Sequence, residues 1–221
     1  MHTWEVTPEE AVALQEQLRG RVQTTDTLPL DAIHTVAGID VSYRTLGRAA
    51  VVVLALPDLT VVDQAVAERA VAFPYVPGLL SFREIPVVLD ALAQLRVQPD
   101  VLMCDGYGYA HPRRFGLASH LGVYLDRPTL GCAKSRFIGT HTEPGPQVGD
   151  HSPLLDAGET VGMVVRTRAG TKPIYVSLGH RLSLATAVAL TLRCSAGYRV
   201  PEPTRLADIL ATPGSSVKRK T

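Results

Sequence analysis

The order of the β-rich segments most constrains the fold of this chain. Three runs of residues rich in Val and Ala, 36–43, 49–56 and 61–71, follow one another closely. The turns between them, Leu46-Gly47 and Pro57-Asp58, are short. Consecutive β runs joined by such turns predict an antiparallel meander.

The pattern changes after the third run. Apolar residues recur at helical spacing over 85–95 and again over 115–125, and short apolar runs at 101–104 and 129–133 are typical of buried strands. Strands that alternate with helices form parallel crossover units. We therefore expect a single α/β domain over residues 1–221, with a mixed sheet of antiparallel meander and parallel crossover strands flanked by helices.

The remaining segments add peripheral elements. Thr7-Pro8-Glu9-Glu10 has the capping-box form and predicts a helix over 8–21. The sequence also predicts a hairpin of strands 163–167 and 174–178, helices over 183–193 and 204–210, a turn-rich surface excursion over 140–160, and a disordered basic tail over 212–221.

Charge and cysteine usage bound the class of protein. Lys and Arg number 22 against 21 Asp and Glu, so a polyanion-binding surface must be local; the candidates are His111-Pro112-Arg113-Arg114, Lys134 with Arg136, and the tail Lys218-Arg219-Lys220. The three cysteines are widely spaced among apolar neighbours, which favours reduced, buried thiols and a cytoplasmic location. No stretch approaches the roughly 18 apolar residues of a membrane span, so we expect no membrane partner.

An aspartate stands in the middle of the first β run. Asp40 alternates with Ile39 and Val41 and so points to the opposite face of the strand. Strands are depleted in aspartate, and a buried carboxylate needs a partner or a cation. The alternative is an edge strand that leaves Asp40 in water.

Two further acids lie where elements begin or end. Asp105 follows the run 101–104, at the carboxyl end of a strand expected to be parallel, where open α/β sheets place their sites. Asp-Gly is also an ordinary turn signal. Glu84 fits a capping box that starts at Ser81, but Pro86 favours a helix beginning nearer Glu84, with the carboxylate at the helix mouth.

Three carboxylates from separate segments suit a hard divalent cation. Magnesium is favoured, because it takes one or two protein carboxylates and leaves positions for water and phosphate. Phosphodiester hydrolysis is the matching chemistry. Lys134, after the run 129–133, can hold a water or neutralise the phosphate; the alternative is a solvated lysine.

Four sequence blocks in this order and spacing resemble the endonuclease V family. They are GIDVSY (38–43), PYVPGLLSFRE (74–84), DGYGYAHPRRFGLASHLG (105–122) and GCAKSRFIG (131–139), and the likeness extends from about 36 to 208. The resemblance implies a ribonuclease H-like fold. It also implies a magnesium-dependent DNA-repair endonuclease, with manganese able to substitute, that recognises deoxyinosine and hydrolyses a phosphodiester bond on the 3′ side of the lesion.

The resemblance assigns roles to these acids. Asp40, Glu84 and Asp105 match the family's metal-binding acids, and Lys134 matches its catalytic lysine. Asp208 matches a further metal-facing position; the alternative is an exposed residue on a short terminal helix.

The resemblance also implies a surface for the damaged base. The loop Pro74, Tyr75, Val76 and Pro77 matches a stiff wedge whose tyrosine fills the gap left in the duplex. The pocket for the extruded base matches Gly78, Leu79, Leu80, Gly106, His111 and Leu117. An ordinary stiff loop and turn glycines are the alternatives. Tyr107 stands where the family commonly has histidine and cannot transfer protons as histidine does at neutral pH.

Two other functions remain open from the sequence. One is cleavage of inosine-containing RNA, because a flipped base says little about the adjoining sugar. The other is a module that binds lesions without cutting, which the set of uncompensated acids disfavours. We expect a monomer whose partner is deoxyinosine-containing DNA.

Overall fold

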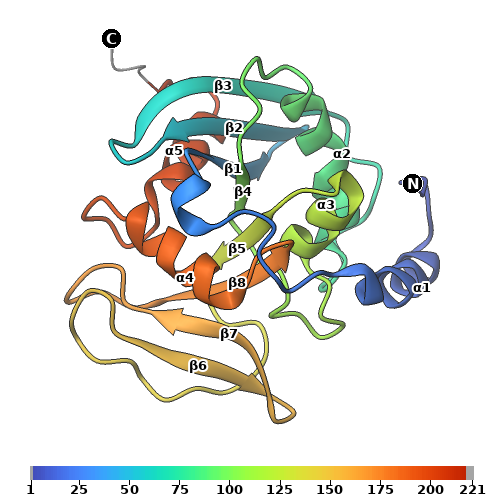
Figure 1. Ribbon diagram of the computed structural model, residues 1–221. Coiled ribbons are helices and arrows are strands. Elements are labelled where there is room, and N and C mark those ends of the chain that lie inside the picture. The colour runs from blue at the N-terminus through green and yellow to red at the C-terminus, as the bar shows by residue number, and fades with distance from the viewer. Residues whose placement is uncertain (1, 218–221) are drawn as a thin grey trace.

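Eight strands of residues 2–217, the part of the chain described by the computed structural model, form one mixed sheet in the order β3-β2-β1-β4-β5-β8-β7-β6 (Figure 1). Strands β1 (Thr35–Tyr43), β2 (Gly47–Ala55) and β3 (Thr60–Arg69) pair antiparallel as the predicted meander. Strands β4 (Val101–Cys104) and β5 (Thr129–Ala133) continue the sheet parallel to β1.

The second half of the sheet is antiparallel. Strand β8 (Ile174–His180) pairs with β5 and with β7 (Glu159–Val165), which confirms the predicted hairpin, and β6 (His151–Asp156) forms the far edge. The predicted fold class, a ribonuclease H-like mixed sheet flanked by helices, is confirmed.

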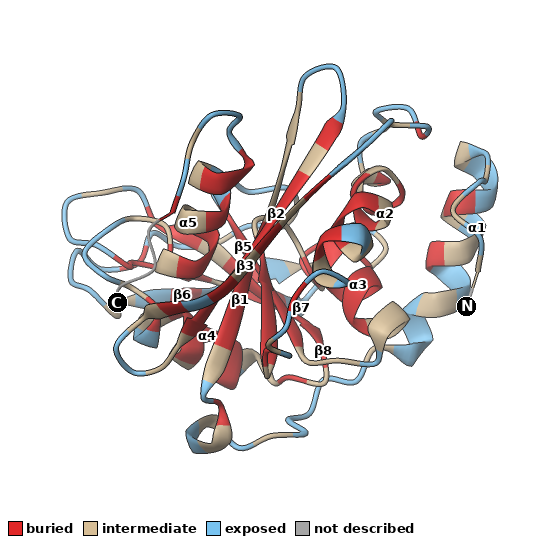
Figure 2. Ribbon diagram, turned by 90° about the horizontal axis from the view of Figure 1, so that it is seen from above, coloured by how far each residue is buried: buried red, intermediate tan, exposed pale blue. Residues whose placement is uncertain are grey.

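Helices cover both faces of this sheet (Figure 2). One face packs against α2 (Leu80–Leu92) and α3 (Leu117–Leu125), and the other against α4 (Leu184–Arg193) and α5 (Glu202–Ala211). Helix α1 (Pro8–Leu18) lies outside α3 and starts at the predicted capping box, in which Thr7 N donates to Glu10 Oε2 at 2.8 Å. Short 3-10 helices cover Arg19–Arg21 and Leu30–Ala32.

The two largest cores lie on opposite faces of the central strands. Ala37 and Ile39 of β1 pack under α2 and α3, whereas Val36 packs with Val101 and Met103 toward α4. The three cysteines are free and buried in these cores, which confirms the prediction of buried thiols.

Helix α2 begins earlier than the sequence indicated. It starts at Leu80 and holds Pro86 inside, so the prediction of a start near Glu84 is wrong. Leu79, the N-cap residue, makes no side-chain cap, and Ser81 is a buried helical residue. Proline weakens a helix interior, but burial of Ile85, Val88 and other residues against the sheet keeps the turn helical.

The segment 140–160 is more ordered than predicted. It contains β6 and the start of β7, so a surface excursion describes only its first part. Pro153 made a strand difficult to predict here, because proline is rare in strands. It is tolerated in β6 because β6 is an edge strand, where a missing N–H can face outward.

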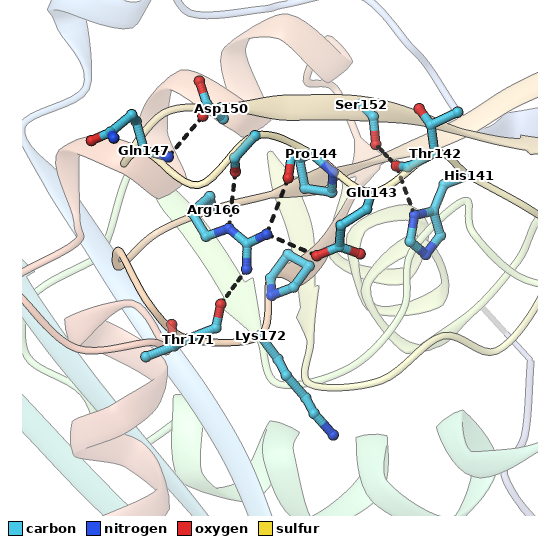
Figure 3. A network of polar contacts seen from close by, with 12 residues as sticks. His141, Thr142, Glu143, Pro144, Gln147, Asp150, Ser152, Arg166, Thr171 and Lys172 are labelled. Carbon is cyan, nitrogen blue, oxygen red and sulfur yellow. Dashed lines mark hydrogen bonds and ion pairs between the residues drawn. The ribbon is translucent and has the colours of Figure 1, made fainter.

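A buried arginine holds the loop that precedes β6 (Figure 3). Arg166, at the end of β7, donates from Nε to Gly145 O at 3.1 Å and from Nη2 to Pro144 O at 3.1 Å and Glu143 Oε1 at 2.8 Å. Its Nη1 donates to Thr171 O. One guanidinium therefore ties the loop to the β7–β8 turn.

The carboxyl-terminal segment is described as far as residue 217. Val217 packs with Leu210 of α5 and Leu54 of β2. The basic cluster of the predicted tail, 218–220, lies outside the described residues. Within residues 2–217, no helix combines the length and apolar character needed to cross a bilayer.

Candidate active site

Asp40, inside β1, and Asp105, directly after β4, stand side by side where the parallel pairing of these two strands ends. The backbone N–H of Asp105 donates to Ile39 O at 2.9 Å and so extends the β1–β4 ladder by one residue. Strand β1 is interior to the sheet, between β2 and β4, so the edge-strand alternative for Asp40 is wrong.

Helix α5 packs on β1 beside Asp40 because of a glycine. A Cβ on Gly38 would lie 1.9 Å from Pro203 O, so only glycine lets α5 lie directly on the strand. Asp40 is two residues further along and shares the face of Gly38. Asp208, on α5 with a side chain 54% exposed, therefore comes into the electrostatic field of Asp40.

Lys134 contacts two of the acids. Its Nζ lies 2.6 Å from Asp105 Oδ2 and 3.5 Å from Asp208 Oδ2. Partial burial opposes its charge, but these carboxylates raise the pKa of Lys134 overall. The lysine is therefore held as a cation among the acids and is not simply solvated.

Glu84 approaches from α2. It lies within the second turn of the helix, 7% exposed, so it is neither a cap nor at the helix mouth. Burial and then the charge of Asp40 raise its pKa well above the usual range. The structure thus gathers Asp40, Glu84, Asp105, Lys134 and Asp208 at one end of the sheet, from β1, α2, the ends of β4 and β5, and α5.

The acids disfavour one another's charge. Burial, and then the charges of Asp105 and Asp208, raise the pKa of Asp40 to about 7. Burial also raises the pKa of Asp105, against the opposing contact with Lys134. Carboxylates that are destabilised in this way attract a cation.

The donor set fits a hard divalent cation by its chemistry. Carboxylate oxygens are the ligands that Mg²⁺ prefers, and burial, which raises the pKa of each of these acids, removes water that a bound cation would replace. Across residues 2–217, no three His, Cys, Asp or Glu side chains are arranged to hold a metal ion as they stand. Asp105 is instead engaged by Lys134.

Two side chains fix the backbone around Lys134. Tyr107 Oη donates to Ser135 O at 3.0 Å, and Arg199 Nη2 donates to Lys134 O at 2.5 Å. The Tyr107 ring also packs against Phe137, with ring centroids 5.2 Å apart. Sequence reasoning considered Tyr107 only as a replacement for a histidine that cannot transfer protons in the same way. It missed this anchoring contact, which joins residues far apart in the chain.

A cavity of about 180 Å³ adjoins the acids. Its lining includes Leu80 and Ser81, which share α2 with Glu84, and Tyr107, two residues after Asp105. Seven of the ten predicted base-contacting residues line it: Tyr75, Val76, Pro77, Gly78, Leu80, His111 and Leu117. Five further residues line the cavity although sequence reasoning did not assign them to it: Gln15, Ser81, Tyr107, Gly116 and Phe137.

The other predicted pocket residues lie beside this lining. Pro74 precedes it on an exposed stretch, and Gly106 lies behind Leu117, whose Cδ2 is 3.4 Å from an ideal Cβ on Gly106. Leu79 is 2% exposed and packs with Phe73 and Phe82, so its predicted place in the pocket is wrong. Tyr75 is 72% exposed at the rim.

His111 is held neutral in the pocket wall. Burial, and then the nearby charge of Arg113, lower the pKa of His111 to about 4. Its Nδ1 accepts from Arg113 N at 3.2 Å, which assigns the ring proton to Nε2, 3.0 Å from Gly78 O. The ring is a hydrogen-bond donor there at neutral pH.

The predicted basic patch at 111–114 is already paired. Arg113 donates to Gln15 and to Gly78 O. Arg114 forms ion pairs of 2.8 Å with Asp156 and with Glu159. Both guanidinium groups are therefore engaged within the protein, Arg113 at the cavity and Arg114 at the β6–β7 hairpin.

Comparisons with known proteins bear on this arrangement. A sequence model described as Endonuclease V matches residues 16–209. A relative named Endonuclease V from Roseiflexus sp. strain RS-1 is 55% identical over 213 residues, covering 96% of this chain and 95% of its own.

Two solved structures are similar over nearly the whole chain. The Endonuclease V of Streptomyces avermitilis superposes with a TM-score of 0.90 at 50% identity, over 94% of this chain and 92% of its own. The Endonuclease V of Ciona intestinalis, solved with a 24mer DNA containing an inosine followed by a ribo-adenosine, has a TM-score of 0.82 at 31% identity, over 92% and 95%. The chain therefore belongs to the endonuclease V family and is a nuclease.

Proposed function

We propose that this protein is a magnesium-dependent repair endonuclease that recognises deoxyinosine in DNA and hydrolyses a phosphodiester bond on the 3′ side of the lesion. The observation that carries the proposal is the cavity beside the cluster of Asp40, Glu84, Asp105 and Lys134 in a chain of this family. The Ciona relative, solved with inosine-containing DNA, supports the choice of base.

The acids of the cluster are the proposed metal ligands. Asp40, Glu84, Asp105 and Asp208 would hold Mg²⁺, or Mn²⁺ in its place, through carboxylate oxygens. When bound, a divalent cation activates water and neutralises developing charge on a phosphate. Two of these acids, Asp40 and Asp105, are fixed by adjoining strands, which gives the site a rigid base.

Lys134 serves the phosphate in this proposal. Its side chain is 42% exposed beside Asp105 and Asp208, so an entering phosphodiester can reach it. The contacts of Tyr107 and Arg199 with the backbone at 134–135 keep the ammonium group beside the acids. A cation held in place in advance stabilises charge on the reacting phosphate without reorganising during the reaction.

The rim loop is the proposed wedge. Tyr75 is exposed between Pro74 and Pro77, in a loop whose prolines restrict the backbone. Its ring can stack where the extruded base was, while the cavity behind it receives that base.

The test uses matched oligonucleotides. Duplex DNA with one deoxyinosine, the same duplex without it, and an inosine-containing RNA of the same sequence are incubated with Mg²⁺, Mn²⁺ or a chelator, and the products are sized. We expect one cut 3′ to deoxyinosine with either metal and none with the chelator. Cleavage in the chelator contradicts metal dependence, a preference for the RNA makes the protein an inosine endoribonuclease, and binding without cleavage makes it a lesion reader.

A further inference from the structure

Gln15 is a polar residue on the buried face of α1, 1% exposed, and it lines the cavity. Ala11 and Gln15, one helical turn apart, are the two residues that α1 buries. A buried amide must find partners for its polar groups. The partners of this amide therefore show what α1 holds in place.

The Gln15 side chain joins two segments that line the cavity. Its Nε2 donates to Gly78 O at 3.0 Å and to Phe115 O at 3.1 Å. Gly78 directly follows the proposed wedge loop, and Phe115 leads into the lining residues Gly116 and Leu117. One amide thus links the loop to the start of α3.

The Gly78 carbonyl receives three donors. Besides Gln15, the Nε2 of His111 and the Nη2 of Arg113 each lie 3.0 Å from this oxygen. Arg113 also donates from Nε to Gln15 Oε1 at 2.6 Å, which closes the network. A carbonyl has two lone pairs, so this one is fully engaged and the orientation of its peptide is fixed.

Glycine is required at the centre of this network. Gly78 has φ +83°, and a Cβ there would lie 2.9 Å from Arg113 Nη2. The backbone of the wedge loop is thus held in a conformation that other residues resist. None of the Gln15 contacts involves an acid of the cluster or Lys134.

We propose that Gln15 is a positioning residue that sets the separation of the two cavity walls and thereby the selectivity for an extruded, deaminated purine over undamaged DNA. The inference rests on the proposed function and extends it to α1. Gln15 precedes the segment matched by the family, 16–209, and belongs to none of the sequence blocks that indicated the family.

The test compares two substitutions with a control on the same helix. Gln15→Glu keeps an acceptor for Arg113 Nε but loses both donations to the walls, and Gln15→Met has a similar volume without either function. Gln17→Ala alters an exposed position of α1. Binding to the deoxyinosine duplex and to the undamaged duplex is measured in chelator. Single-turnover cleavage is measured in Mg²⁺ at saturating enzyme. The melting temperature is measured without DNA.

Both Gln15 variants should lose roughly tenfold or more in the ratio of lesion binding to undamaged binding, because two buried carbonyls lose a donor. Their saturated cleavage rate should stay within about threefold of wild type, because the acids and Lys134 are untouched. The control should match wild type in every measurement.

Four outcomes overturn the inference. Gln15 is a folding residue if the variants lose affinity equally for both duplexes. The same holds if their melting temperature falls while the ratio of lesion binding to undamaged binding is unchanged. A wild-type protein with no preference for deoxyinosine overturns the proposed function and this inference together. A wild-type preference that the variants retain overturns this inference alone. If Gln15→Met does not fold, Gln15→Glu decides the question.

Discussion

The acid cluster and the cavity beside it differ in how their polar groups are satisfied. In the cluster, burial and neighbouring negative charge raise the pKa values of Asp40, Glu84 and Asp105. In the cavity wall, Gln15, His111 and Arg113 form a closed network around one carbonyl. The first region disfavours the charge of its own carboxylates, and the second is hydrogen-bonded within the protein.

The difference separates two requirements of a nuclease. Chemistry on a phosphate uses carboxylates whose charge the protein itself leaves uncompensated, and such groups reduce stability. Recognition of a base uses walls that do not rearrange, and satisfied buried networks provide that rigidity. Substitutions in the two regions should therefore change activity and stability in different combinations.

The largest expected effect is that of Asp40→Asn. Cleavage of the deoxyinosine duplex in Mg²⁺ should fall by about a hundredfold or more, because a proposed metal ligand is lost. Binding to the same duplex in chelator should persist, since the change removes a negative charge that repels phosphate. Single-turnover kinetics and binding curves check both, and retained cleavage would contradict the metal assignment.

Asp40→Asn also tests whether the acid cluster lowers the stability of the folded protein. The pKa of Asp40 is about 7 in the folded protein against 3.8 as its ordinary value, so the folded state loses stability as pH rises through 7. Without metal, Asp40→Asn should melt higher than wild type at pH 8, and the gain should shrink toward pH 5. A lower melting temperature at pH 8 would mean that Asp40 stabilises the fold.

The next effect concerns Lys134. Lys134→Ala should slow the saturated single-turnover rate by roughly ten- to a hundredfold, because a cation beside the reacting phosphate is lost. Duplex affinity should change much less, since one lysine is a small share of the phosphate contacts. An unchanged rate with weaker binding would make Lys134 a phosphate anchor only.

The sequence predicted the acid cluster better than it predicted the cavity. Asp40 and Asp105 follow from strand alternation and strand ends, which are local patterns, and the structure places them side by side. Glu84 was found for the wrong local reason, because the packing of α2 overrides the signal of Pro86. Tertiary burial is not visible in a window of ten residues.

The hydrogen-bond network of the cavity wall could not be predicted from local sequence patterns. Gln15 lies on an amphipathic helix and contacts residues 63 to 100 positions away, and no spacing rule links them. The arginines at 113 and 114 suggested a phosphate patch by composition, whereas their partners are within the protein. Strand β6 was missed because Pro153 hides its alternation.

The third effect is that of Tyr75→Ala on discrimination. Loss of the exposed ring should weaken binding to the deoxyinosine duplex by roughly 1–3 kcal/mol, the range of base–aromatic stacking. Single-stranded inosine DNA should suffer less, because there is little stacking to replace. Binding curves on both substrates at one salt concentration check this, and equal losses would make Tyr75 a general contact.

The smallest expected effect is a pH dependence of stability that originates in the cavity wall. The pKa of His111 is about 4 in the folded protein against 6.5 as its ordinary value, so its contribution is present above pH 6.5 and is lost as pH falls toward 4. Burial and the charges of Arg113 and Arg114 oppose the imidazolium, while its hydrogen bond to Gly78 favours it. The direction is opposite to that expected for Asp40.

A substitution that keeps the hydrogen-bond donor of His111 but cannot titrate isolates the contribution of His111 to the pH dependence of stability. His111→Gln places an amide N–H near Gly78 O but does not titrate. As the pH falls from 6.5 to 4.5, the free energy of unfolding should decrease by roughly 1–2 kcal/mol less in the variant than in wild type. This range follows from the lowered pKa of His111, reduced to allow for relaxation of the protein. Denaturant unfolding at several pH values in chelator measures it. Parallel curves for the two proteins would show that His111 titrates normally, and the cavity wall would then be less rigidly satisfied than its hydrogen bonds indicate.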